Sequence, residues 1–332
     1  MIMIECIFTI DYEVYGSGEG SLKDLVYEPA ERIAAIFRKR GIRFVAFVEV
    51  AELEVIGTEG TDPAIDLVKK QVRDFHGEGF ELGLHLHPQW CNARYENRKW
   101  LLDYSEYNLC TLPRERIVRI VDHSITHFRE LLGAADFTPF SFRAGNWLMQ
   151  PTRAAAKVLT QRGIKVDSSV FKGGVQHEPK MDYRRARRNG YYWKFTDDTN
   201  EPDPEGALLE LPIHTRMVPF WEMVSAKRLG LQQKGVSGGR GHKKKLNRLL
   251  DFMRFRYPLK LDFCRMTIRE LTAMMDKVIL EDEKNPTGFK PIVAIGHTKD
   301  LVDFETVESF LSYLEQKGIT ISTFKDVYPK CQ

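Results

Sequence analysis

The sequence predicts an α/β fold built on parallel strands, with enough strands to form a barrel. One local pattern occurs three times: a helical segment ends in a basic residue, then Gly-Ile follows, then a strand. In each copy glycine supplies the left-handed residue just past a helix, and the cation suits the helix C-terminus. Repeated short helix-to-strand joints are typical of parallel α/β sheets. The three copies are centred on Gly41-Ile42, Gly163-Ile164 and Gly318-Ile319.

Short apolar runs and longer amphipathic runs alternate along the whole chain, which predicts alternating strands and helices. Strands are expected at 5–11, 42–48, 80–87, 139–143, 164–167, 208–213 and 291–295, with a short eighth at 319–322. Helices are expected at 29–40, 63–76, 114–132, 151–162, 268–280 and 303–317. Pro29 suits the first turn of its helix, and Asp62 suits an N-cap. This count favours a single barrel domain over residues 1–332 rather than two domains.

Composition and charge narrow the class of protein. The 332 residues are 43% hydrophobic and 29% charged, as in an ordinary globular protein. A net charge of +3 is too small to favour nucleic acid as a partner. No stretch approaches the ~18 apolar residues of a membrane span. The five cysteines contain no CxxC pair, so neither a disulfide framework nor a zinc ribbon is predicted.

The N-terminal run, MIMIECIFTI, is apolar but has no basic region and no small-residue cleavage site. A buried first strand is therefore a better interpretation than a signal peptide, and we expect a cytoplasmic protein.

Residues 225–262 form the least regular part of the chain and are expected to be a basic helical or loop insertion. They contain eleven Lys and Arg against two Asp. Such a segment could contact an anionic membrane surface or a polyanion. A solvated insertion without a partner is the interpretation that this composition favours.

Acid, base and metal-ligand side chains stand at the ends of the predicted strands. Because the carboxyl ends of barrel strands meet at one mouth, these residues are expected to lie close together. They are Asp11, Glu13, His85, His87, Arg143, Asp167, His214 and His297.

His85 and His87 are the sharpest local signal. Residues i and i+2 of an extended segment point to the same side, so both imidazoles should face one point. Together with a carboxylate they would form the His₂-carboxylate set of a zinc site. Asp11 and Glu13 have the same spacing, so one could bind the metal while the other acts as a base. His297 is a natural general acid.

Five segments, taken in order, resemble the motifs of the polysaccharide deacetylases. This group is carbohydrate esterase family four, of the chitooligosaccharide deacetylase type, and the chain resembles a divergent branch. The segments are residues 9–13, 81–87, 142–147, 166–169 and 295–297. The resemblance implies a distorted (β/α)₇ TIM-like barrel and one divalent metal ion, usually Zn²⁺. It also implies removal of N- or O-linked acetyl groups from a carbohydrate, such as a polysaccharide or a glycan precursor.

The resemblance also implies individual roles. Asp11 matches the catalytic base. Tyr12 stands where the family has a second Asp, so Glu13 is expected to replace it as a metal ligand. His85 matches the first histidine ligand. His87 follows after two residues instead of four, so its metal role depends on the shared face of the strand.

The remaining motifs complete the expected site. Arg143 matches the arginine that orients the base, and Asp167 matches the acid that tunes the catalytic histidine, His297. Four further residues are candidates for contact with the sugar: Trp147, Trp90, Tyr12 and His214.

Two other interpretations remain open from the sequence. The HxH pair also occurs in amidohydrolase and PHP-type phosphoesterase barrels, which usually carry it on the first strand and bind two or three metals. Alternatively, the barrel could be a non-catalytic glycan-binding relative in polysaccharide biosynthesis.

Overall fold

The computed structural model describes residues 3–176, 178, 180–223, 227–228, 255–286 and 288–332. Most of the predicted basic insertion at 225–262 therefore lies outside the described residues. Its described C-terminal part contains a strand, β13 (Tyr257–Lys260), that pairs antiparallel with β12 (Thr215–Val218).

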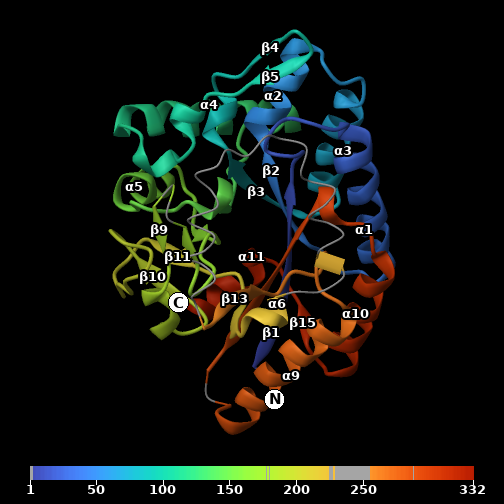
Figure 1. The fold of residues 1–332 in the computed structure, drawn as a ribbon, viewed down its shortest axis with the longest axis vertical. Helices are drawn as coiled ribbons and strands as arrows, with labels where there is room; N and C mark the ends of the chain where they lie inside the picture. The colour runs from blue at the N-terminus through green and yellow to red at the C-terminus, as the bar shows by residue number, and fades with distance from the viewer. Residues whose placement is uncertain (1–2, 177, 179, 224–226, 229–254, 287) are drawn as a thin grey trace.

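A curled, mostly parallel sheet forms the centre of the molecule, as Figure 1 shows. Its strand order is β10-β11-β7-β6-β3-β2-β1-β14, with β15 also pairing with β1. Only the β10–β11 pair is antiparallel among these neighbours. The strands are β1 (Ile4–Tyr12), β2 (Val45–Glu49), β3 (Glu81–Leu86), β6 (Ser141–Ala144), β7 (Val166–Asp167), β10 (Trp193–Phe195), β11 (Leu208–Glu210), β14 (Lys290–His297) and β15 (Thr320–Ile321).

The sheet is closed into a barrel by isolated contacts rather than by a full strand. Beyond β11, Ile213 forms parallel bridges with Phe171 and with Val293 of β14. The amide of His214 also donates to the carbonyl of Val293 at 2.9 Å. The predicted α/β fold, a distorted TIM-like barrel, is confirmed.

Helices surround the sheet, as Figure 1 shows for α1, α3, α4, α5 and α10. No helix in the described part of the chain is long and apolar enough to cross a bilayer. The helices are α1 (Glu28–Lys39), α2 (Val50–Glu59), α3 (Ile65–Gly77), α4 (Arg114–Leu132), α5 (Arg153–Gln161), α6 (Phe220–Met223), α9 (Ile268–Lys284), α10 (Phe304–Gln316) and α11 (Phe324–Val327).

Short hairpins and helical turns lie outside the main sheet. Two further hairpins pair β4 (Arg94–Glu96) with β5 (Lys99–Leu101), and β8 (Val175–Gln176) with β9 (Met181–Asp182). One π-helical turn spans Lys23–Tyr27. The 3₁₀ turns are Pro88–Trp90, Tyr104–Glu106, Leu109–Thr111, Gly145–Trp147, Arg185–Arg188, Thr298–Asp300 and Tyr328–Cys331.

Within the part of the chain that the structure describes, α2 is the one long helix that the sequence did not predict. It begins directly where β2 ends, without a linker, and the side chain of Glu49 caps it by accepting from the amides of Ala51 and Glu52. Its buried residues include Glu52 as well as apolar side chains, so its sequence lacks a clean amphipathic period. The junction of β2 and α2 thus places two buried glutamates, Glu49 at the end of β2 and Glu52 in the first turn of α2, close to the mouth of the barrel.

Candidate metal-binding active site

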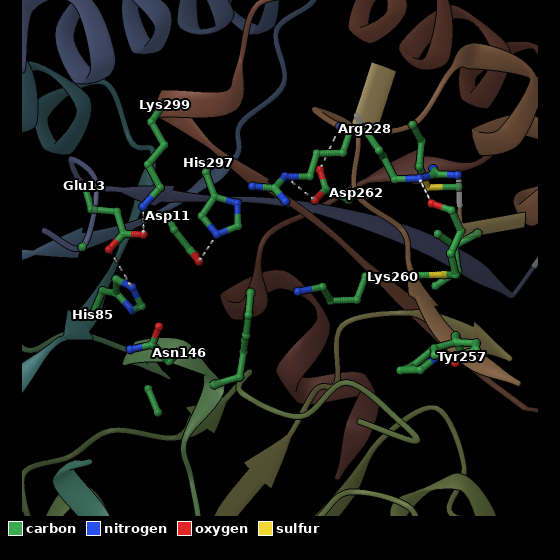
Figure 2. A pocket seen from close by; sticks show the side chains of 18 of the residues that line it. Asp11, Glu13, His85, Asn146, Arg228, Tyr257, Lys260, Asp262, His297 and Lys299 are labelled. Carbon is green, nitrogen blue, oxygen red and sulfur yellow. Dashed lines mark hydrogen bonds and ion pairs between the residues drawn. The ribbon is translucent and has the colours of Figure 1, made fainter. Parts of the chain in front are cut away.

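A cavity of about 590 Å³ opens at the carboxyl ends of the strands. The clustering predicted from the strand ends is found there, because Asp11, Glu13, His85, His87 and His297 all line it. Figure 2 shows Asp11, Glu13, His85 and His297 toward one end of the cavity and Arg228 and Tyr257 toward the other. The remaining lining residues are Gly16, Ala144, Asn146, Trp147, Phe220, Met223, Arg228, Tyr257, Pro258, Leu259, Lys260, Asp262, Arg265, Met266 and Lys299.

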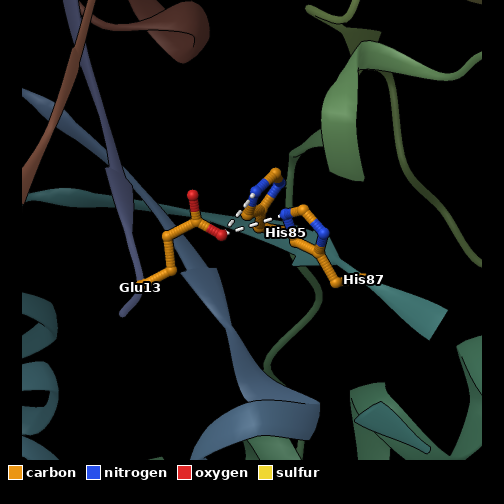
Figure 3. A group of neighbouring side chains, drawn as sticks. All are labelled: Glu13, His85 and His87. Carbon is orange, nitrogen blue, oxygen red and sulfur yellow. Dashed lines mark ion pairs between the residues drawn. The ribbon is translucent and has the colours of Figure 1, made fainter. Parts of the chain in front are cut away.

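Glu13, His85 and His87 form a buried cluster with their ligand atoms directed at one another, as Figure 3 shows. Oε2 of Glu13 lies 3.5 Å from Nε2 of His85 and 3.0 Å from Nε2 of His87. The three ligand atoms lie within 4.8 Å of one another. Burial alone would raise the pKa of Glu13, but Lys299 and the two histidines hold it well below its usual range. The carboxylate is therefore ionised, as a metal ligand must be.

The orientation of His85 leaves its Nε2 atom available to a metal. Its Nδ1 lies 2.8 Å from the carbonyl oxygen of Arg143, which can only accept a hydrogen bond. Nδ1 therefore carries the proton, and Nε2 faces Glu13. Although burial opposes it, Glu13 and Asp11 raise the pKa of His85 to about 9. The surrounding carboxylates thus favour a positive charge at His85, either as a proton on Nε2 or as a metal ion bound there.

His87 is held by two amide side chains. Its Nδ1 lies 3.2 Å from the Gln89 amide nitrogen and 3.3 Å from that of Asn146. The Gln89 oxygen is buried without a hydrogen-bond partner. A half-turn of that amide exchanges its nitrogen and oxygen. The Gln89 oxygen then accepts from Nδ1 of His87, and Nε2 is left free for a metal. Carbonyl partners of this kind are typical behind zinc-ligating histidines, so the residues present fit a divalent metal.

Asp11 lies beside the metal cluster and is held by Arg143. Nη1 of Arg143 donates to Oδ1 of Asp11 at 2.6 Å, and the guanidinium is fully buried. Its other donors reach the Thr9 hydroxyl at 3.0 Å and the hydroxyl and carbonyl of Ser168 at 3.2 and 2.9 Å. Burial would raise the pKa of Asp11, but Arg143 and then His297 lower it. Asp11 is therefore an ionised, rigidly oriented carboxylate.

His297 completes the polar group at the end of β14. Its Nε2 lies 3.3 Å from Oδ2 of Asp11. Its Nδ1 is buried without a hydrogen bond and lies 3.9 Å from Oδ2 of Asp300. Burial lowers the pKa of His297, while Asp11 and Asp300 oppose that shift.

Asp167 does not lie beside His297, so its predicted role is corrected. Oδ1 of Asp167 accepts from the Ser169 hydroxyl at 2.6 Å, and Asp167 lies opposite Glu210 in the pairing of β7 with β11. Its strand, β7, does not pair with β14 but lies between β6 and β11 in the sheet. Among the described residues, the carboxylates that pair with His297 are Asp11 and Asp300.

Three of the four predicted sugar contacts are also corrected. Tyr12 is 1% exposed because it alternates with Asp11 and Glu13 and points to the opposite face, where its hydroxyl donates to Gln71. Trp90 is 1% exposed and packs edge-on against Trp100.

The third is His214. Its ring stacks on Tyr191, with centroids 6.4 Å apart, and it is not among the described residues that line the cavity. Burial lowers the pKa of His214 to about 4, so it is neutral there.

Trp147 does line the cavity, as predicted. One of its faces is covered by the ammonium group of Lys260, 3.2 Å from the ring centroid. Trp147 and the preceding Asn146 have φ values of +61° and +53°, which non-glycine residues rarely adopt. Such backbone strain clusters at functional sites.

Several residues of the site were missed in the sequence. Lys299 donates to Oε1 of Glu13 at 2.6 Å, and Asp300 accepts from Nε of Arg265 at 2.8 Å. Their position directly after His297 was the available signal. Lys260 and Arg265 gave none, because they lie in or next to the segment expected to be an insertion.

Two buried glutamates that were also missed in the sequence bond to the backbone next to the Glu13-His85-His87 cluster. Oε2 of Glu49 accepts from the backbone amide of His87 at 2.6 Å, and Oε1 of Glu52 accepts from that of Val14 at 2.8 Å. Burial raises the pKa of Glu49 to about 8 and that of Glu52 well above its ordinary value. Glu49 therefore fixes the backbone of His87, and Glu52 fixes the backbone of Val14, the residue after Glu13.

No protein-family model and no curated protein matches this sequence. Solved structures do match over nearly the whole chain. A candidate polysaccharide deacetylase from Mycobacterium smegmatis is 14% identical, with a TM-score of 0.53, covering 99% of this chain and 90% of that one. A GH57 branching enzyme from Thermococcus kodakaraensis is 11% identical, with a TM-score of 0.57. The match covers 100% of this chain and 72% of that one.

Puue allantoinase is 14% identical to this chain, with a TM-score of 0.52, covering 98% of this chain and 89% of that one. At these identities the likeness shows a shared fold. The protein thus belongs to a class of distorted α/β barrels that includes a candidate polysaccharide deacetylase. More particularly, it is a barrel of this class with a buried Glu-His-His cluster at its mouth.

Proposed function

We propose that this protein is a metal-dependent hydrolase that removes N- or O-linked acetyl groups from a carbohydrate. The observation that carries the proposal is the presence, in one cavity, of a His₂-carboxylate cluster beside a separate Asp-Arg-His group. The first can hold a metal, and the second can move a proton. The ordered motifs and the fold shared with a candidate polysaccharide deacetylase support the same reaction class.

Glu13, His85 and His87 would hold the metal, with zinc as the expected ion. When bound, such a metal polarises an acyl carbonyl and lowers the pKa of water. Asp11 accepts a proton from the attacking water, and Arg143 keeps Asp11 ionised beforehand. His297 donates a proton to the leaving nitrogen or oxygen. Because Nε2 of His297 lies 3.3 Å from Oδ2 of Asp11, the proton can pass from base to acid within the site.

Acetate release tests the proposal. The zinc-loaded protein should release acetate from acetylated sugars, and panels of N-acetyl and O-acetyl sugars would separate amide from ester substrates. Asp11→Asn should abolish release while zinc stays bound, because Asp11 is assigned as the base. A zinc-loaded wild-type protein that releases acetate from neither panel would contradict the proposal. Loss of zinc from Asp11→Asn would make Asp11 a ligand instead of the base.

Glycan binding without turnover is the second candidate. The observation that favours it is the Lys299 ammonium group, 2.6 Å from Oε1 of Glu13, which partly neutralises an expected metal ligand. Under this alternative the protein would bind an acetylated sugar equally well with and without zinc, and no acetate would be released.

A further inference from the structure

Lys260 is a cation inside the candidate active site that the proposed reaction does not use. It lies at the end of β13 and lines the same cavity as Asp11 and His297. Figure 2 shows its side chain extending from β13 toward the centre of the cavity. Its Nζ lies 3.2 Å from the centroid of the Trp147 ring and 4.9 Å from that of Phe171. Two aromatic rings thus fix the position of the ammonium group.

Lys260 forms no ion pair with a carboxylate of the described residues. Lys299 and Arg265, two other cations of the cavity, form ion pairs with Glu13 and Asp300 at 2.6 and 2.5 Å. In contrast, no carboxylate oxygen of the described residues lies within 4.0 Å of the Lys260 ammonium group. Burial lowers the pKa of Lys260 to about 7, with Arg265 and Arg143 acting in the same direction and the carboxylates of Asp262 and Asp11 opposing the shift. An anion placed beside Lys260 would offset the cost of burying its charge.

We propose that Lys260 binds an anionic group, a carboxylate or a phosphate, carried by the carbohydrate substrate. The substrate class would then be an acidic acetylated sugar, and this inference rests on the proposed function of the same site. Lys260 and the Asp11-His297 pair line one cavity of about 590 Å³, a volume typical of pockets for single small molecules. The anion and the acetyl group would therefore belong to the same molecule.

The competing explanation is that Lys260 only packs on Trp147. Lys260→Met distinguishes anion binding from packing, because methionine keeps an unbranched side chain that can cover the indole ring but carries no charge. Lys260→Arg keeps the charge and the stacking. Lys165→Met is the matched control, because Lys165 is exposed and lies just before β7, at the end of the strand away from the cavity.

Calorimetric titration of the zinc-loaded full chain tests the proposal with four sugars. N-acetylglucosamine is neutral. Its uronic acid carries a carboxylate at carbon 6, and its 6-phosphate and 1-phosphate carry a phosphate at either end. At least one acidic sugar should bind about tenfold to a hundredfold more tightly than the neutral one, as expected for a charge-assisted hydrogen bond. The tightest of the acidic sugars identifies the anion and its position.

Lys260→Met should abolish this preference, whereas Lys260→Arg and Lys165→Met should keep it. Equal binding of all four sugars to the wild type, or no binding of any, overturns the inference. A preference that survives in Lys260→Met also overturns it. If Lys260→Met fails to fold by circular dichroism, Lys260→Gln replaces it. If Lys260→Met loses the preference for the acidic sugar but neither it nor the wild type releases acetate, the anion site is supported. The deacetylase proposal is then refuted.

Discussion

Asp11 lies between Arg143 and His297, with one carboxylate oxygen 2.6 Å from the arginine and the other 3.3 Å from Nε2 of the histidine. The three residues come from β1, β6 and the last residue of β14. Glu13, two residues further along the chain, faces the two histidines of β3 and its end. Parallel strand ends thus place the proton-transfer group directly beside the candidate metal cluster.

Removal of the Arg143 charge should destabilise the fold as well as the site. We predict that Arg143→Met lowers the free energy of unfolding by about 3–5 kcal/mol, because it leaves the buried Asp11 carboxylate without its partner. Urea denaturation measures this. Adding Asp11→Asn should restore part of the loss. The control is Arg162→Met, whose ion pair with Asp122 is partly exposed and should contribute about 0–1 kcal/mol. Equal losses in the two single variants would argue against a buried, paired Asp11.

Asp300, rather than Asp167, should tune His297. The Asp300 carboxylate raises the pKa of His297, so Asp300→Asn lowers that pKa further. Protonated His297 is then lost at a lower pH, and the basic limb of the kcat profile for acetate release moves to lower pH. Asp167→Asn should leave this limb in place. A limb that moves in Asp167→Asn and stays fixed in Asp300→Asn would restore the assignment made from the sequence.

Gln89 should support metal binding through His87. We predict that Gln89→Leu weakens zinc binding about tenfold to a hundredfold, as is typical for a lost partner of a ligating histidine. Competition with a chromogenic chelator measures the affinity. Gln71→Leu is the control, because Gln71 is also a buried amide but bonds to Tyr12 and Glu31 on the far side of β1. Equal zinc affinities in wild type and Gln89→Leu would contradict this role.

The buried carboxyl groups of Asp167 and Glu210 should make the fold less stable as the pH rises. Burial raises the pKa of both groups, that of Glu210 well above its ordinary value. The folded protein therefore keeps a proton that the unfolded chain loses, so stability falls as pH rises from the ordinary carboxyl pKa through the raised one.

Glu210→Gln should reduce this fall, because it removes one of the two titrating groups. Thermal unfolding from pH 5 to 9 measures the effect, and the comparison is the slope of Tm against pH in the two proteins. Parallel slopes would show that the pair does not share a proton.

The sequence was sufficient for the parallel barrel, because glycine C-caps and apolar strands are local signals. It was also sufficient for the convergence of Asp11, Glu13, His85, His87 and His297, because strand ends meet at one mouth. The same period-two rule that paired Asp11 with Glu13 could have excluded Tyr12 from the site. The environment of Asp167 depends on strand order in the sheet, and no local pattern encodes that order.

The place of Lys260 in the cavity also depends on long-range strand pairing, so the sequence did not predict it. Lys260 enters the cavity through pairing of β13 with β12, which are separated by 38 residues between Val218 and Tyr257. Basic residues in that segment suggested a solvated insertion, whereas β13 in fact contributes one wall of the cavity. Long-range pairing of this kind leaves no trace in local composition.

Metal content tests the central claim most directly. Elemental analysis should compare chelator-free wild type, His85→Ala and, as a control for an exposed histidine, His123→Ala, each before and after incubation with zinc. The account predicts about one zinc ion per chain in wild type and His123→Ala, and its loss in His85→Ala. A wild-type protein that binds no metal even after zinc is added would contradict the metal-dependent mechanism.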